Sequence, residues 1–299
     1  MASKVEKRFK GIFVALVTPM TADQEVDHES LRSMIEHMID QGVHGIIPLG
    51  STGEYYALSD DERQAVTAET IEAVAGRASV VVGVNGGSTR AVIGYARQAE
   101  KLGADGLLVA APYYALPTPG ELVEHLRSVA GAVGLPIMLY NYPARTGVDM
   151  TPDVVQRVAE LDNVQYIKES TGDEARMGEI ARCCGESISL FCGCDTLAIE
   201  AFETGAVGWV GGGVNVLPAL HVEMYEQVAR GDFVAARAAY ERIRPVMELM
   251  ENGGKYTQFV KAGCGIMGHP VGPPRQPLLP ISPDELAVLQ NALAIYQSV

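Results

Sequence analysis

One lysine in the middle of the chain follows an apolar run typical of a buried strand. Lys168 ends the stretch VQYIK at residues 164–168 and is the only lysine between Lys101 and Lys255. Burial removes hydration from an ammonium group, so we expect the pKa of this amine to fall towards neutrality. A neutral amine attacks a ketone or aldehyde and forms a Schiff base, which stabilises a neighbouring carbanion. The alternative is a solvated lysine at a strand end, which position alone favours.

A tyrosine ends a similar apolar run earlier in the chain. Tyr140 follows PIML at residues 136–139. If these two runs form adjacent parallel strands, the phenol lies beside Lys168 and can relay protons to and from an adduct on the amine. Packing alone does not demand a phenol hydroxyl there. The pair therefore predicts acid–base chemistry at a carbonyl group.

Three further loops follow expected strands and carry polar groups. Ser51 and Thr52 lie in GSTGE, where two hydroxyls and free backbone N–H groups could hold a carboxylate or pass a proton. Arg145 lies in PARTG and could clamp a second carboxylate with its forked guanidinium. An ordinary turn and a solvated arginine are the alternatives. The rings of Tyr113 and Tyr114 follow a further run and are more typical of packing or a subunit contact.

The elements that must position these residues alternate along the chain. A motif of two glycines three residues apart, followed by an apolar run, recurs at 41–50, 102–112 and 204–213. This pattern is typical of the point where a helix ends and a buried parallel strand begins. With five more apolar runs, at 11–17, 79–84, 136–141, 164–168 and 189–193, these three phrases predict eight strands. Capping residues predict helices at 27–40, 59–75, 89–102, 118–133, 151–161, 172–183 and 195–203.

Eight strand–helix units over this length favour an α/β fold, a (β/α)₈ TIM barrel, in which the carboxyl ends of the strands build the active site. An open doubly wound sheet would more often carry a glycine-rich nucleotide turn after its first strand, and none is present. Beyond residue 217 the pattern becomes helical. We therefore expect a barrel domain over 1–217 with the active site and a C-terminal helical appendage over 218–299.

Composition excludes several classes of function. The net charge is −14, and without a basic cluster this opposes nucleic-acid binding. No apolar run is long enough to span a bilayer, and the N-terminus lacks the apolar core of a secretory signal, so we expect no membrane partner and a cytoplasmic protein. Five cysteines, two of them adjacent, suit reduced thiols, and six scattered histidines predict no metal site.

Taken together, the motifs GSTGE, APYYALP, LYNYPARTG and YIKESTGD resemble, in order and spacing, the pyruvate-dependent Schiff-base aldolase family that includes dihydrodipicolinate synthase and N-acetylneuraminate lyase. The resemblance covers nearly the whole chain. It implies a lyase or synthase that binds pyruvate or a related 2-oxo acid as an imine, needs no cofactor, and assembles as a homotetramer built from two dimers.

The resemblance also assigns roles to individual residues. Lys168 matches the imine-forming lysine, and Tyr140 matches the tyrosine that shuttles protons. Ser51 matches the hydroxyl that links this tyrosine to a second one, Tyr114, which in the family reaches in from a neighbouring subunit. The remaining matches are to substrate-binding positions: Thr52 for the pyruvate carboxylate, the Val210 carbonyl near the lysine, and Arg145 for the carboxylate of aspartate semialdehyde.

Departures from the family pattern leave the substrate open. Ser51 is more typical of the N-acetylneuraminate lyases, whereas Arg145 is more typical of the synthases. Gly87 and Ala91 replace residues of lysine-regulated members, which argues against lysine feedback. The leading expectation is a dihydrodipicolinate synthase. The alternatives are a catabolic relative, such as a 2-keto-3-deoxy sugar acid aldolase or dehydratase, an N-acetylneuraminate lyase or a hydroxyproline-pathway deaminase, and a non-catalytic barrel that binds 2-oxo acids.

Overall fold

The computed structural model describes residues 8–296, and its strands form the expected parallel barrel. Neighbouring strands pair in chain order, and the sheet is closed. The strands are β1 (Gly11–Ala15), β2 (Gly45–Ile47), β3 (Ser79–Gly83), β4 (Gly106–Ala110), β5 (Ile137–Asn141), β6 (Val164–Glu169), β7 (Ser189–Cys192) and β8 (Gly208–Gly211). The predicted (β/α)₈ barrel with further C-terminal helices is confirmed.

Helices follow the strands and, apart from α5, lie close to where the sequence predicts helical segments. They are α1 (His28–Asp40), α2 (Asp60–Val74), α3 (Thr89–Leu102), α4 (Pro119–Ala130), α5 (Pro143–Thr146), α6 (Pro152–Val158), α7 (Glu174–Cys184) and α8 (Ala198–Glu203), then α9 (Pro218–Ala229), α10 (Phe233–Asn252), α11 (Tyr256–Ile266) and α12 (Pro283–Leu293). Ser59, Thr118 and Ser282 each begin a helix with reciprocal capping bonds to a glutamate three residues on. Within residues 8–296, no helix has the length and apolar character needed to cross a membrane.

Contacts divide the chain into two compact units, one running up to Lys10 and over Val80–Val210, the other over Gly11–Ser79 and from Gly211 onward. The expected domain boundary at residue 217 stays a prediction, and the outermost residues of both expected domains, 1–7 and 297–299, lie outside the described residues. Each unit is held together by its own core.

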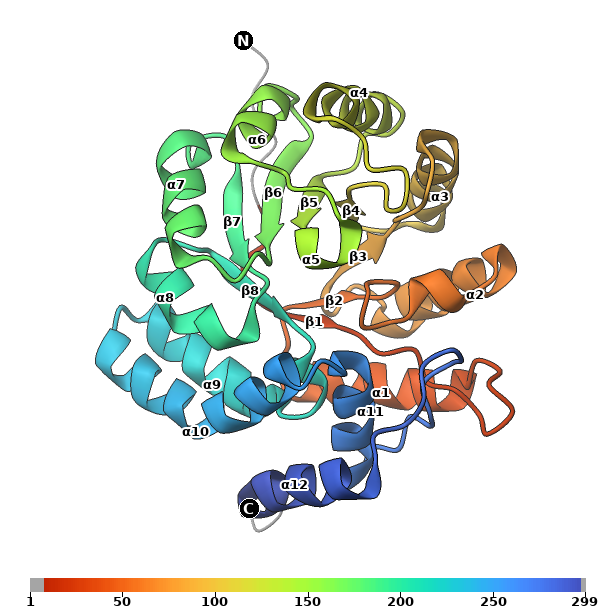
Figure 1. The fold of residues 1–299 in the computed structure, drawn as a ribbon, viewed down its shortest axis with the longest axis vertical. Helices are drawn as coiled ribbons and strands as arrows, with labels where there is room; N and C mark the ends of the chain where they lie inside the picture. The colour runs from red at the N-terminus through yellow and green to blue at the C-terminus, as the bar shows by residue number, and fades with distance from the viewer. Residues whose placement is uncertain (1–7, 297–299) are drawn as a thin grey trace. The chain divides into compact units, whose positions relative to one another are not determined.

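In the first unit, aromatic side chains fill the space between the strands below Lys168. Tyr166 lies two residues before Lys168 and so on the same face of β6. Its ring lies 4.9 Å from that of Phe9 and 5.9 Å from that of Phe191, and its hydroxyl accepts a hydrogen bond from the Phe9 amide at 3.1 Å. Helices α3, α4, α6 and α7 lie around the outside of these strands (Figure 1).

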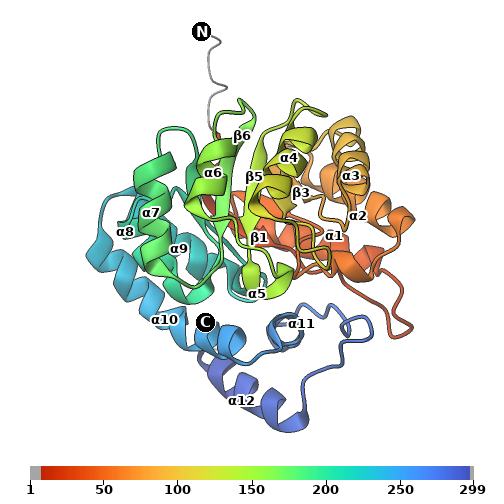
Figure 2. The ribbon, with the colours of Figure 1, turned by 45° about the horizontal axis from the view of Figure 1, so that its top comes forward.

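The second unit joins the first two strands to the C-terminal helices. Asn215, beyond β8, donates a hydrogen bond to the Ala15 carbonyl at 2.8 Å and accepts one from the Val17 amide at 3.1 Å. Arg275 donates to the Glu62 carboxylate at 2.7 and 2.9 Å, which holds the loop before α12 against the start of α2. Helix α12 packs on α11 (Figure 2).

Candidate active site

Lys168 and Tyr140 lie side by side on adjacent strands. The register of β5 and β6 pairs Tyr140 with Lys168, and the Lys168 Nζ lies 4.3 Å from the centre of the Tyr140 ring. Each residue is only 5% exposed. Among the described residues, the Lys168 Nζ makes no hydrogen bond or ion pair, and its electrostatic contact is a cation–π interaction with the Tyr140 ring. A buried amine is therefore held against a phenol without a carboxylate to neutralise it.

The next residue on each strand points to the opposite face, where a polar network holds it. Asn141 pairs with Glu169 in the same register, and its Nδ2 donates to the Glu169 carboxylate at 3.0 Å and to Asp149 at 2.9 Å. The Thr171 amide donates to the other Glu169 oxygen at 2.7 Å. Arg176 of α7 closes the network with two bonds to Asp149 from one nitrogen, at 2.9 and 3.1 Å. Because side chains alternate along a strand, this anchoring directs Lys168 and Tyr140 inward.

The two carboxylates of this network respond differently to their surroundings. Burial raises the pKa of Glu169, and the hydrogen bonds from Asn141 and Thr171 offset only part of that effect. Burial acts in the same direction on Asp149, but the hydrogen bonds from Arg176 and Asn141 outweigh it and leave the pKa of Asp149 lowered. The network is thus anchored by a charged Asp149–Arg176 pair.

A glycine that sequence reasoning missed makes room for the lysine. A Cβ atom on Gly193, just after β7, would lie 2.0 Å from Oγ of Ser170 and 2.7 and 2.8 Å from Cγ and Cε of Lys168, closer than real Cβ contacts allow. The Gly193 amide donates to the Glu169 carbonyl at 2.8 Å, and Ser170 donates to the Gly193 carbonyl at 2.9 Å. In the sequence, Gly193 lies in CGCD, and nothing in that short stretch points to a lysine on another strand. Its meaning depends on the neighbouring strand.

Arg145 lies beyond the end of β5, as expected, but on a short helix that was not predicted. Pro143 begins α5, and Gly147 ends it with a φ of 70°. The exposed Arg145 guanidinium lies 5.6 Å from the centre of the Tyr142 ring, which in turn lies 6.0 Å from that of Tyr140. One aromatic ring, that of Tyr142, therefore lies between the Tyr140 phenol and an exposed cation.

Tyr114 makes almost no contact with its own chain. It is 96% exposed, and its φ of 69° is in the left-handed region that non-glycine residues rarely adopt. The loop that carries Tyr114 packs closely on the loop that carries Arg145. Leu116 lies so near Gly147 that a Cβ on Gly147 would be only 2.6 Å from the Leu116 side chain. The geometry of one chain does not bring Tyr114 to Lys168.

The remaining expected residues each follow or end a strand. Ser51 and Thr52 lie in the turns after β2, where Thr18 donates to the Gly53 carbonyl at 2.7 Å and fixes the loop. Thr52 is 4% exposed, and Ser51 is partly exposed. Val210 is fully buried in β8. Among the described residues, no group of three or more His, Cys, Asp or Glu side chains is placed to hold a metal ion.

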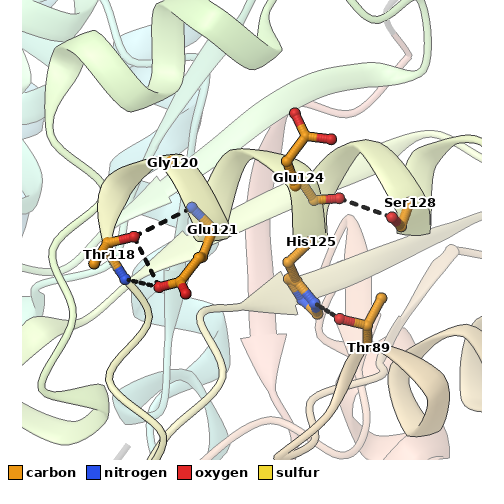
Figure 3. A pocket seen from close by; sticks show the side chains of 7 residues that line it. All are labelled: Thr89, Thr118, Gly120, Glu121, Glu124, His125 and Ser128. Carbon is orange, nitrogen blue, oxygen red and sulfur yellow. Dashed lines mark hydrogen bonds between the residues drawn. The ribbon is translucent and has the colours of Figure 1, made fainter.

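A cavity of about 540 Å³ lies between α3 and α4, apart from Lys168 and Tyr140 (Figure 3). Thr118 and Glu121 form the capping box of α4, Ser128 bonds back to its own helix, and the Nδ1 of His125 contacts Thr89 at 2.9 Å, whereas the buried His125 Nε2 has no hydrogen-bond partner among the described residues. Burial lowers the pKa of His125. No side chain of this cavity resembles a nucleophile poised for reaction, unlike Lys168.

Known proteins with a similar sequence or fold agree on one family. The model of the dihydrodipicolinate synthetase family matches residues 8–296. The 4-hydroxy-tetrahydrodipicolinate synthase of Pelobacter propionicus is 36% identical over 96% of this chain and 99% of its own. The crystal structure of a chloride-inhibited dihydrodipicolinate synthase from Acinetobacter baumannii, complexed with pyruvate, superposes with a TM-score of 0.91 at 33% identity, covering 95% of this chain and 98% of that one.

A dihydrodipicolinate synthase variant described as monomeric has the same fold, with a TM-score of 0.92 at 32% identity over 96% of both chains. The family match spans all the described residues, including both units and the strands that carry Lys168 and Tyr140. This chain therefore belongs to the dihydrodipicolinate synthetase family.

Proposed function

We propose that this chain is a Schiff-base synthase that joins pyruvate, held as an imine on Lys168, to aspartate semialdehyde, as the family resemblance implies; relatives at 36% identity are named 4-hydroxy-tetrahydrodipicolinate synthases. The observation that carries the proposal is the buried Lys168 amine lying 4.3 Å from the Tyr140 ring without an anionic partner among the described residues.

The first step is attack of the Lys168 amine on the ketone carbon of pyruvate. The nitrogen gains a bond to carbon, the carbonyl oxygen leaves as water, and a protonated imine remains. Tyr140 lies against the amine and is the group that delivers and removes protons during this exchange. The low exposure of both residues keeps bulk water from competing for the imine.

The second step forms the carbon–carbon bond. Loss of a proton from the pyruvate methyl group converts the imine to an enamine, whose carbon attacks the aldehyde carbon of the second substrate. Attack of the amine of that substrate on the imine carbon then closes a ring and releases Lys168. The protonated imine is the electron sink throughout, so we propose that no cofactor takes part.

The residues that hold the substrates are carried over from the family. We assign the pyruvate carboxylate to Thr52, a proton link to Ser51, a backbone acceptor to the Val210 carbonyl, and the second carboxylate to Arg145. The exposed position of Arg145, with its guanidinium against Tyr142, supports the last assignment, because an entering anion reaches an exposed cation before it reaches the buried amine.

We propose a homotetramer in which Tyr114 completes the site of a neighbouring subunit. The extreme exposure of its ring and its left-handed backbone support this, because such strain persists where a function maintains it. The relative described as monomeric makes the assembly a direct experimental question. We place the protein in the cytoplasm, on the strength of its cysteine usage alone.

Borohydride reduction in the presence of pyruvate tests the imine. We expect a stable pyruvate-derived mass on one lysine per chain, mapped to Lys168, and none in a Lys168→Arg variant. Lys101→Arg is the matched control, since Lys101 is exposed in the last turn of α3. A chain that gains no mass, or gains it at another lysine, would refute the assignment. A non-catalytic binding barrel predicts binding of pyruvate without reduction to a covalent product.

The second substrate is tested by comparing turnover. We expect pyruvate with aspartate semialdehyde to react faster than any of a panel of 2-keto-3-deoxy sugar acids, N-acetylneuraminate and hydroxyproline-derived acids. An Arg145→Gln variant should raise the KM for aspartate semialdehyde while trapping of pyruvate alone is unchanged. Faster turnover of a panel member would keep the imine and replace the synthase assignment by that catabolic reaction.

A further inference from the structure

Two adjacent thiols at the end of α7 face one another. Cys183 and Cys184 are the last residues of the helix, and their sulfur atoms are 3.2 Å apart. Neighbouring residues on an α-helix are rotated by about 100°, so their side chains ordinarily diverge. In this pair both side chains turn toward a shared point instead.

The backbone around the pair is fixed by hydrogen bonds. The Cys184 carbonyl accepts from the Ser187 amide at 2.9 Å and the Ile188 amide at 2.8 Å, and the Gly185 amide donates to the Ala181 carbonyl at 3.2 Å. β7 begins directly afterwards at Ser189. The thiols therefore lie at the amino end of a barrel strand, whereas Lys168 lies near the carboxyl end of one, and the imine chemistry does not use them.

Both thiols line an open cavity of about 400 Å³, together with Glu160 and Arg182. Cys183 is partly exposed, and Cys184 is 4% exposed but borders the cavity. Burial, with the neighbouring Cys183 thiol, raises the pKa of Cys184 to about 12. A reagent in the cavity thus meets a reachable thiol with a second, protonated thiol directly beside it.

The number of ligands selects the kind of partner. Structural zinc sites take about four protein ligands, and among the described residues no cluster of three or more candidate ligands exists. A disulfide between adjacent cysteines must span a Cα separation of about 3.8 Å, shorter than the usual 4.4–6.8 Å, and would distort the helix end. A trivalent arsenical with one organic substituent needs two sulfurs and no third protein ligand.

We propose that Cys183 and Cys184 form a chelating site for monosubstituted trivalent arsenicals. In water such a compound carries two hydroxyl groups on arsenic. Each thiol forms an As–S bond as one As–O bond breaks, and the thiol proton leaves with the hydroxide as water. Two waters are released, arsenic stays trivalent, and no oxidant is required. The 3.2 Å separation allows both sulfurs to reach one arsenic atom without unwinding α7.

Phenylarsine oxide, added to the full-length reduced protein, tests the site. Intact mass should show one bound phenylarsine per chain. Cleavage after glutamate releases residues 180–186, which contain Cys183 and Cys184 but not Cys192 or Cys194, and we expect the added mass on this peptide. An excess of 2,3-dimercaptopropanol should remove it, whereas a monothiol should not.

Because the second bond is intramolecular, loss of either sulfur should weaken binding by about 10²–10⁴-fold. We expect this for Cys183→Ser and Cys184→Ala, and no change for the matched variants Cys194→Ser and Cys264→Ser. Cys183 is partly exposed, so Cys183→Ser decides the matter if the buried Cys184 variant fails to fold. The proposal is overturned if the wild type binds no phenylarsine, if the mass lies on the peptide with Cys192 and Cys194, or if Cys183→Ser binds as tightly as the wild type.

Discussion

Two of the lysines within residues 8–296 are buried, and their surroundings differ in one decisive respect. Lys261 of α11 is 3% exposed, lies 2.5 Å from a Glu54 oxygen and donates to the Pro273 carbonyl at 3.0 Å. Lys168 is 5% exposed, lies over the Tyr140 ring and has no anionic partner among the described residues. The Lys261 amine is bound in an ion pair within the fold, whereas the Lys168 amine can react with a substrate.

The difference shows how a buried cation is used for stability or for chemistry. Burial lowers the pKa of Lys261, and the Glu54 carboxylate opposes that effect, as expected for a buried ion pair. The Lys261–Glu54 ion pair joins α11 to the loop before α2. The Glu54 carboxylate also accepts a hydrogen bond from the Arg275 amide at 2.8 Å. A lysine without such a partner can give its lone pair to a substrate carbon.

The largest expected effect is loss of activity on removing the available amine. Lys168→Met should lower turnover of pyruvate with aspartate semialdehyde by about 10³-fold or more, because no imine can form. Its free energy of unfolding should change by less than about 1 kcal/mol, since no ion pair is broken. Steady-state kinetics and urea unfolding measure the two quantities. Retained turnover would end the distinction between the two lysines.

The complementary change at the committed amine should act on stability. Lys261→Met leaves the Glu54 carboxylate buried without its partner and should lower the free energy of unfolding by about 3–5 kcal/mol. Adding Glu54→Gln removes the stranded charge and should restore part of that loss. Urea midpoints with an unchanged slope report the effect. A double variant less stable than Lys261→Met would contradict the ion-pair interpretation.

A smaller loss of activity is expected from a change in the space around the Lys168 side chain. Gly193→Ala places a methyl group against both the Ser170 hydroxyl and the Lys168 side chain, and it should slow imine formation with pyruvate by about 10–10²-fold, because the amine is displaced by a fraction of an ångström. Gly178→Ala in α7 is the matched control, as its nearest contact would be an ordinary 3.8 Å. Trapping rates with borohydride measure both. Equal rates in the two variants would show that Gly193 does not set the lysine position.

The smallest expected effect concerns a third buried basic group, His125, and the pH dependence of the free energy of unfolding. Because burial lowers the pKa of His125 in the folded chain, the unfolded chain binds its proton first as pH falls. This contribution to stability is complete above about pH 6.5 and is lost below it. His125→Gln should reduce the loss of unfolding free energy at acid pH by no more than about 1 kcal/mol. The pKa of His37 is also lowered, by burial and by His269, so His37 contributes to the same loss. Urea midpoints across this range test the slope, and an unaltered slope in the variant would exclude His125.

Local signals in the sequence were enough for the elements. Capping at Ser59 and Thr118 marked helix starts within a residue, and short apolar runs marked all eight strands in the described part of the chain. The α5 helix was missed because its four residues are too few to show periodicity. Its start depends on Pro143 and its end on Gly147, signals that a turn shares.

The sequence by itself determined the order of strands and helices and the resemblance to the family, because these depend on residue type and on spacing along the chain, whereas the register that pairs Tyr140 with Lys168 came from the structure. Only the tertiary structure decided why Gly193 must be glycine, which lysine has a carboxylate partner, and that the thiols of Cys183 and Cys184 face one another. These depend on distances between side chains, most of them distant in sequence. Such distances are set by packing, which no local pattern encodes.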